Sequence, residues 1–149
     1  MSVAPAPAVN GQVIGQAHYA TRAVLEHLLV ATGTTFHQCV ALNATADAGG
    51  TVERRRLADR LAATLKIESS SAESTLSELV TAGLLAELPG DEPRVTMTDS
   101  GGELQRRTRA GTAAITARLY ADLPAEDLAT AGRVLTVVTA RANAVLAEG

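Results

Sequence analysis

Residues 52–98 follow one order of parts: a helix, a turn, a second helix and a short hairpin. The first helix contains an amphipathic segment over 56–61, and the second ends in the apolar run 79–85. The hairpin turns at the Pro- and Gly-containing stretch 89–93 and returns through 94–98. This order is typical of a winged helix-turn-helix, in which the second helix lies in a DNA groove. It predicts a mainly α fold with a small β-hairpin wing.

Helices are predicted on both sides of this unit. Apolar residues recur at three- and four-residue steps over 13–31, and a shorter helix is expected over 36–46. A long helix is expected over 99–121, and Pro124 is placed to open a last helix. That last helix carries an apolar stripe of Leu128, Ala131, Leu135, Val138, Ala142 and Val145.

We therefore expect three regions. Residues 1–12 form a disordered Pro- and Ala-rich tail, and 51–98 form the winged helix-turn-helix DNA-binding region. Residues 13–50 and 99–149 form a helical dimerisation region, because thin helices with one apolar stripe cover each other poorly within one chain. A two-fold homodimer would cover them. The alternative is that the stripes pack only within a single chain.

Three helix starts are predicted from capping residues. Thr51 is expected to cap the first helix of the winged unit. Ser70 and Glu73 have the spacing of a capping box at the start of the second helix, and Ser100 and Glu103 repeat that spacing in the long helix.

The composition narrows the class of protein further. Of 149 residues, 46% are apolar but only 2% are aromatic, so the core is expected to consist of Leu, Val and Ala. No apolar run approaches the roughly 20 residues that span a bilayer, so no membrane partner is expected. Cys39 is the only cysteine and has no partner for an internal disulfide, which favours a cytoplasmic protein.

The layout resembles the multiple-antibiotic-resistance regulator (MarR) family over nearly the whole chain. The resemblance is most specific at 52–61 and 76–85, at the step 97–101 that leaves the wing, and at the step 123–128 into the last helix. It implies a homodimeric transcription factor whose terminal helices form the dimer interface. It also implies a near-palindromic operator in double-stranded DNA and a small-molecule effector. The prediction that follows is a ligand-responsive repressor.

The charge of the winged unit departs from this pattern. Residues 51–98 contain six basic and eight acidic side chains, a formal charge of −2, whereas phosphate contacts supply most non-specific DNA affinity. The second helix has no Lys or Arg, and Asp91 and Glu92 lie at the wing tip. The alternative is therefore a winged-helix protein-interaction module or co-regulator with weakened or lost DNA binding.

The candidate DNA-binding residues are serines of the second helix and arginines around it. Serine hydroxyls donate to and accept from base edges and phosphates, and arginines bind phosphates or enter a minor groove. The candidates are Arg54, Arg55, Ser69, Ser70, Ser71, Ser74 and Arg94.

Each of these candidates also has a structural interpretation. Ser70 and Glu73 are expected first of all to cap their helix, although Glu73 is also able to accept from a cytosine amino group. Arg94 is placed to form a salt bridge with Glu87 across the hairpin. The three consecutive arginines that begin at Arg54 point about 100° apart and can equally belong to a solvated face.

Three residues are candidates for effector binding: His18, Arg22 and Phe36. His18 and Arg22 lie one turn apart beside apolar residues of the first helix, where they would hold an anionic ligand in an apolar cleft. The alternative is a core or interface histidine and an arginine that extends its stem over apolar surface.

No cofactor and no enzymatic activity are expected. The spacing of His18, His27, His37, Cys39 and Glu26 matches no standard zinc pattern, so no metal site is predicted. We interpret Cys39 as buried and inert rather than as an oxidant sensor. The sequence has no nucleophile elbow, phosphate-binding glycine loop or His–carboxylate constellation.

Overall fold

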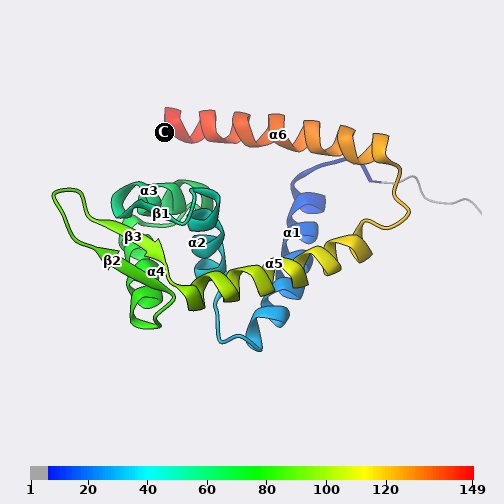
Figure 1. Cartoon of the computed structure of the whole chain (residues 1–149). Helices are drawn as coiled ribbons and strands as arrows, with labels where there is room; N and C mark the ends of the chain where they lie inside the picture. Colours follow the sequence, from blue (N-terminus) through cyan, green and yellow to red (C-terminus); the bar gives the residue numbers. More distant parts are fainter. Residues whose placement is uncertain (1–6) are drawn as a thin grey trace, which may run out of the picture. The chain divides into compact units, whose positions relative to one another are not determined.

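The computed structural model describes residues 7–149. Within them, six helices and one three-stranded sheet follow in the order expected for a mainly α fold with a small wing, which confirms that prediction (Figure 1). The elements are α1 (Gly11–Val30), α2 (Phe36–Asp47), β1 (Thr51–Glu53), α3 (Arg54–Leu65), α4 (Ser69–Thr81), β2 (Leu85–Leu88), β3 (Arg94–Met97), α5 (Asp99–Leu119) and α6 (Ala125–Glu148).

The chain divides into two compact units, residues 1–112 and 113–149. The first unit holds α1 to α4, the sheet and most of α5, and the second holds the end of α5 and all of α6. Residues 1–6 of the expected tail lie outside the described residues. Helix α1 begins at Gly11, two residues before the predicted start at residue 13, because Asn10 caps it by accepting a 2.9 Å hydrogen bond from the Val13 amide.

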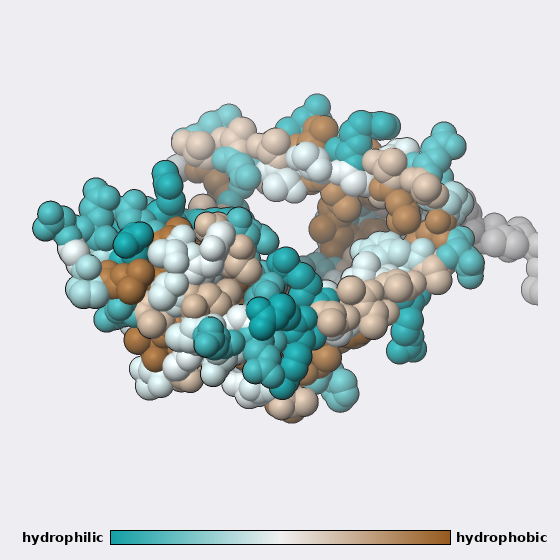
Figure 2. Space-filling model, viewed as in Figure 1, coloured by the Kyte–Doolittle hydropathy of each residue, from teal (hydrophilic) through white to brown (hydrophobic). Residues whose placement is uncertain are grey.

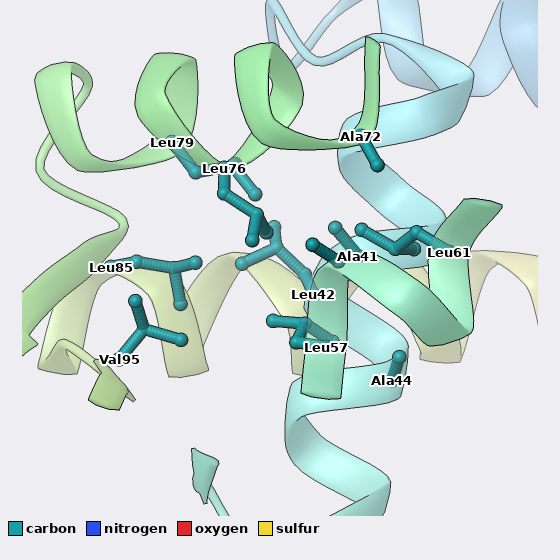
Figure 3. Close-up of a cluster of buried hydrophobic side chains, with 11 residues drawn as sticks. Ala41, Leu42, Ala44, Leu57, Leu61, Ala72, Leu76, Leu79, Leu85 and Val95 are labelled. Carbon is teal, nitrogen blue, oxygen red and sulfur yellow. The ribbon is translucent and has the colours of Figure 1, made fainter. Parts of the chain in front are cut away.

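The core of the first unit lies between α2, α3, α4 and the sheet (Figure 3). Its members are aliphatic, as the composition predicts, and pack without an aromatic ring among them. They are Ala41, Leu42, Ala44, Leu57, Ala58, Leu61, Ala72, Leu76, Leu79, Leu85 and Val95. Burying an aliphatic side chain of this kind stabilises the fold by about 1.5–3 kcal/mol, so this cluster holds the three helices against the wing.

The sheet contains a strand that the sequence did not predict. Its order is β1-β3-β2 and both pairings are antiparallel. Thr51 of β1 pairs with Thr96 of β3, and their hydroxyl oxygens lie 2.7 Å apart. The prediction that Thr51 caps α3 is therefore wrong: pairing with β3 extends the backbone through Glu53, and α3 begins only at Arg54.

The predicted capping box of α4 is also wrong. Helix α4 begins at Ser69 after Glu68, whose side chain makes no capping hydrogen bond. Ser70 is thus already inside the helix. The Glu73 carboxylate accepts a hydrogen bond from Arg54 instead of reaching back to the helix start.

Helix α5 is capped by Thr98, and not by Ser100 with Glu103 as predicted. The Thr98 hydroxyl accepts a 3.0 Å hydrogen bond from the Gly101 amide and donates a 2.7 Å hydrogen bond to the Gly83 carbonyl. One threonine thus starts α5 and ties it to the end of α4. Pro124 stands just before α6 rather than as its first residue.

Gly101 is required where α5 passes the start of β2. Its amide lies at the Thr98 cap, and a Cβ at this position would collide with the Leu84 carbonyl. Gly83 ends α4 with a left-handed φ of 75°, as predicted for a C′ glycine. These two glycines make the junction of α4, β2 and α5 compact.

Helix α6 has no buried residue. Figure 2 shows apolar side chains, in brown and tan, on the visible face of α6. The large apolar residues exposed on it are Leu128, Val134, Leu135, Val137, Val138, Val145 and Leu146. No helix in residues 7–149 has the length and apolar character needed to cross a membrane.

Candidate nucleic-acid interface

Helix α4 has one buried face and one exposed face of uniform chemistry. Its buried residues, Ala72, Thr75, Leu76 and Leu79, recur at helical spacing and face the core. The positions opposite them follow the steps four, three and four and are all exposed. They are Ser70, Ser74, Ser77 and Thr81, which we call the hydroxyl stripe.

Two of the expected serines belong to this stripe and two flank it. Ser70 and Ser74 lie on it, whereas Ser69 and Ser71 are exposed on its two sides. Sequence reasoning did not include Ser77 or Thr81. The signal was present, because both stand at helical spacing from Ser70 and opposite the apolar positions.

Arg54 occupies a different environment from that of an exposed phosphate contact. Only 19% of its side chain is exposed. Its Nε donates to Glu73 Oε2 at 2.9 Å, and its Nη1 donates to Glu87 Oε1 at 3.1 Å. Its Nη2 donates to Ser77 Oγ at 2.9 Å and to the Glu73 carbonyl at 3.4 Å. The guanidinium therefore joins the start of α3 to α4 and to β2.

The second carboxylate of α4, that of Glu78, binds a side chain of α2 rather than one of α3. Gln38 Nε2 of α2 donates to Glu78 Oε2 at 2.9 Å. The carboxylates of Glu73 and Glu78 thus both bind neighbouring side chains at the borders of the hydroxyl stripe. The stripe itself carries no charge.

Arg55 and Arg94 are the expected arginines that remain at the surface. Arg55 is exposed on α3, and Arg94 is exposed at the start of β3. Among the described residues no ion pair joins Arg94 to Glu87, because the Glu87 carboxylate accepts from Arg54 instead. Asp91 and Glu92 are exposed between the two wing strands.

A hollow of about 460 Å³ lies beside α4, between α1 and α2. Arg22 and Phe36 line it together with Ser71 and Ser74. The Arg22 guanidinium stacks 4.1 Å from the centre of the Phe36 ring and binds Glu26 Oε1 at 3.0 Å. This volume is within the usual range of small-molecule sites, about 300–1,000 Å³.

His18 is not among the residues that line this hollow. Its ring lies 5.8 Å from the ring of Tyr19, and both residues are exposed on α1. The structure therefore brings together two of the three expected effector residues, Arg22 and Phe36.

Cys39 is buried, as expected, at 5% exposure. Burial raises the pKa of its thiol, and a weak hydrogen bond from Asn43 opposes that shift. The thiolate is therefore disfavoured at neutral pH, which suits an inert core cysteine. Within residues 7–149 no group of three potential metal ligands gathers.

No protein-family model and no curated protein matches this sequence. Solved structures match it closely in fold. Sco5413, a MarR family transcriptional regulator from Streptomyces coelicolor, aligns with a TM-score of 0.74 at 22% identity, over 89% of this chain and 91% of that one. The chain has the MarR fold.

Two further structures of the MarR fold contain a bound partner. A cysteine-to-serine mutant of MarR from E. coli, complexed with operator DNA, aligns with a TM-score of 0.72 at 20% identity, over 86% of this chain and 91% of that one. CouR from Rhodococcus jostii RHA1, bound to p-coumaroyl-CoA, aligns with a TM-score of 0.72 at 19% identity, over 86% and 89%. Each of these alignments thus covers most of this chain.

Proposed function

We propose that this protein is a homodimeric transcriptional regulator of the MarR type that binds double-stranded DNA and is released by a small-molecule effector. The observation that carries the proposal is the hydroxyl stripe, which is exposed on the second helix of a winged helix-turn-helix. The complex of an E. coli protein of the same fold with operator DNA supports it. Release of DNA on effector binding would make the protein a repressor.

Hydrogen bonds from α4 would read the operator. The hydroxyl stripe enters the major groove, with Ser69 and Ser71 at its sides. Arg55 contacts a phosphate and Arg94 reaches a minor groove or phosphate from the wing. The apolar surface of α6 joins two copies, so that two α4 helices address the two halves of a near-palindromic site.

The effector would occupy the hollow beside α4. Arg22, which shares its charge with Glu26, and the flat ring of Phe36 together suit a planar organic anion that would replace Glu26 at the guanidinium. The hollow borders Ser71 and Ser74, so an occupant would stand where α4 approaches DNA. The CouR structure, which holds p-coumaroyl-CoA, supports an effector for a protein of this fold.

A titration of the protein with duplex DNA tests the main proposal. Fluorescence anisotropy is recorded with DNA from upstream of its own gene and with a scrambled duplex, at several salt concentrations. We expect tighter binding to the upstream DNA and a shallow salt dependence, because few basic residues face the duplex. Equal affinity for both duplexes, even at low salt, would contradict the proposal.

The effector proposal is tested in the same assay. Benzoate, as a simple planar anion, is expected to weaken binding to the upstream DNA. The variant Arg22→Gln should keep its DNA affinity and lose the response to benzoate. The variant Arg133→Gln serves as the matched control, since Arg133 is exposed on α6 and does not line the hollow.

A second candidate function is that of a protein-binding winged helix. The acidic wing tip at Asp91 and Glu92, and a second helix without Lys or Arg, favour it. The double variant Ser70→Ala and Ser74→Ala separates the two functions. A DNA-binding regulator should lose its sequence preference in this variant, whereas a protein-binding module should keep its protein partner.

A further inference from the structure

Arg54 makes four hydrogen bonds, and they extend to residues that are distant in the sequence. Its partners are Glu73 and Ser77 on α4 and Glu87 on β2. Among the described residues, no other side chain of α3 donates hydrogen bonds to both α4 and the wing. Its own backbone amide donates to the Pro93 carbonyl at 3.0 Å, which ties the start of α3 to the return of the hairpin.

The partners of Arg54 show how two carboxylates near the hydroxyl stripe are offset. Glu73 borders the hydroxyl stripe and Glu87 lies on the adjacent strand. Side by side, these two carboxylates would repel each other and any phosphate that approached. A guanidinium between them offsets both charges and fixes both side chains, because its planar fork donates in several directions at once.

We propose that Arg54 is a positioning residue, which locks α4 against the wing and keeps Glu73 and Glu87 away from the DNA-facing surface. Its effect on DNA rests on the function proposed above, but its effect on the structure does not. With only 19% of its side chain exposed and its donors engaged, Arg54 acts through its partners and not by touching DNA.

Amide hydrogen exchange tests the lock without any DNA. The variant Arg54→Gln should exchange faster than wild type in α4 and in β2, because both lose their shared anchor. The variant Arg55→Gln is the matched control: it removes the same charge from the next residue, which is exposed, and should leave those rates unchanged. Equal exchange in the wild type and in Arg54→Gln would overturn the proposal.

DNA binding tests the effect of the lock on the proposed interface. A positioning role and a phosphate contact of Arg54 predict opposite effects of Glu73→Gln on DNA binding. If Arg54 acts through Glu73, then Glu73→Gln should lower the preference for the upstream duplex by about tenfold, as Arg54→Gln does. The double variant should be no worse than Arg54→Gln alone, because that variant already breaks the Arg54–Glu73 interaction. If Arg54 instead binds phosphate, Glu73→Gln tightens DNA binding, and Arg54→Gln lowers the salt slope while the preference is kept.

The two assays keep the proposals separate. Should the wild type show no sequence preference, the proposed function fails, and the exchange rates alone decide the role of Arg54. Should Arg54→Gln fold poorly, Arg54→Lys replaces it, since lysine keeps the charge and loses the fork. We expect Arg54→Lys to exchange faster in α4 and β2 as well, and wild-type rates in this variant would overturn the lock.

Discussion

Helices α4 and α6 have similar mean polarity in sequence but differ in how their apolar residues are used. Helix α4 buries Ala72, Leu76 and Leu79 completely within its own unit and leaves hydroxyl groups outside. Helix α6 leaves Leu135 and Val138 about two-fifths exposed and Val145 nearly two-thirds exposed. The winged unit is thus complete in one chain, whereas α6 displays the kind of apolar surface that a second protein covers.

This difference in burial suggests that the apolar residues of α4 serve folding, whereas those of α6 serve assembly. Substitutions in the core around α4 should change the free energy of unfolding. Substitutions on the apolar stripe of α6 should change the oligomeric state and leave the winged unit folded. Four experiments, in order of expected effect, measure assembly, folding, DNA preference and the accessibility of the buried thiol.

The largest effect is expected from Leu135→Glu combined with Val138→Glu. In a dimer these changes remove four apolar side chains from the interface, so the dissociation constant should rise by about a thousandfold or more. Light scattering should then report a monomer at micromolar concentration. The control is Ala129→Glu with Ala140→Glu, which adds the same charge away from the stripe. A wild type that is itself monomeric would refute the dimer.

The next effect is expected from Gly101→Ala. The new methyl group would collide with the Leu84 carbonyl, a backbone atom, so the first unit should lose about 3 kcal/mol of stability. Chemical denaturation measures the change. Gly102→Ala is the control, because a Cβ there meets only side chains, the flexible end of Arg106 at 3.3 Å and Met97 Cγ at 3.8 Å, and no backbone atom. Equal stability of the two variants would mean that the junction of α4, β2 and α5 is loose.

A smaller effect is expected from the hydroxyl stripe. Ser70→Ala with Ser74→Ala should lower the preference for the upstream duplex by about tenfold or more, since each lost base contact is worth about 1–3 kcal/mol. The salt slope and the melting temperature should stay at their wild-type values, because both side chains are exposed and uncharged. Ser69→Ala, beside the stripe, should have the lesser effect. A larger loss of preference in Ser69→Ala than in the double variant would show that a different face of α4 lies in the groove.

The smallest effect concerns Cys39. Because burial raises its pKa and covers the sulfur, its thiolate population at neutral pH is below that of free cysteine, and the native protein should react with a thiol reagent more slowly than the unfolded protein does. The rate should rise when denaturant opens the unit or when the pH approaches the raised pKa. Hydrogen peroxide should leave DNA affinity unchanged. Rapid labelling of the native protein would show that α2 opens readily.

The order and extent of the helices and the hairpin were predictable from local signals, although the three predicted helix caps were wrong. Gly83 at the end of α4 and the Pro- and Gly-containing turn at 89–93 act within a few residues, and both elements lie where the sequence places them. Strand β1 was not predictable in this way. It has only three residues, and its partner Thr96 is 45 positions away from Thr51. Nothing local distinguishes such a strand from the start of a helix.

The candidate site divides along the same line. The hydroxyl stripe follows from helical spacing alone, so Ser77 and Thr81 were within reach of sequence reasoning. The bonds of Arg54 were not, because its partners Glu73 and Glu87 lie 19 and 33 positions away. With several arginines nearby, the sequence pointed to Arg94 as the partner of Glu87. Only the three-dimensional fold determines which guanidinium binds the Glu87 carboxylate.

If α4 binds DNA as proposed, the uncharged character of the hydroxyl stripe has a consequence for the cell. Most DNA-binding proteins spend much of their time on the chromosome at random positions, held there by counterion release. A DNA-binding protein with few basic side chains at its interface would bind less to random chromosomal positions. A larger share of its copies would then remain available for the operator. Such a regulator would need few molecules per genome to keep a promoter occupied. Its selectivity would come from weak binding to non-specific DNA rather than from very strong binding to the operator.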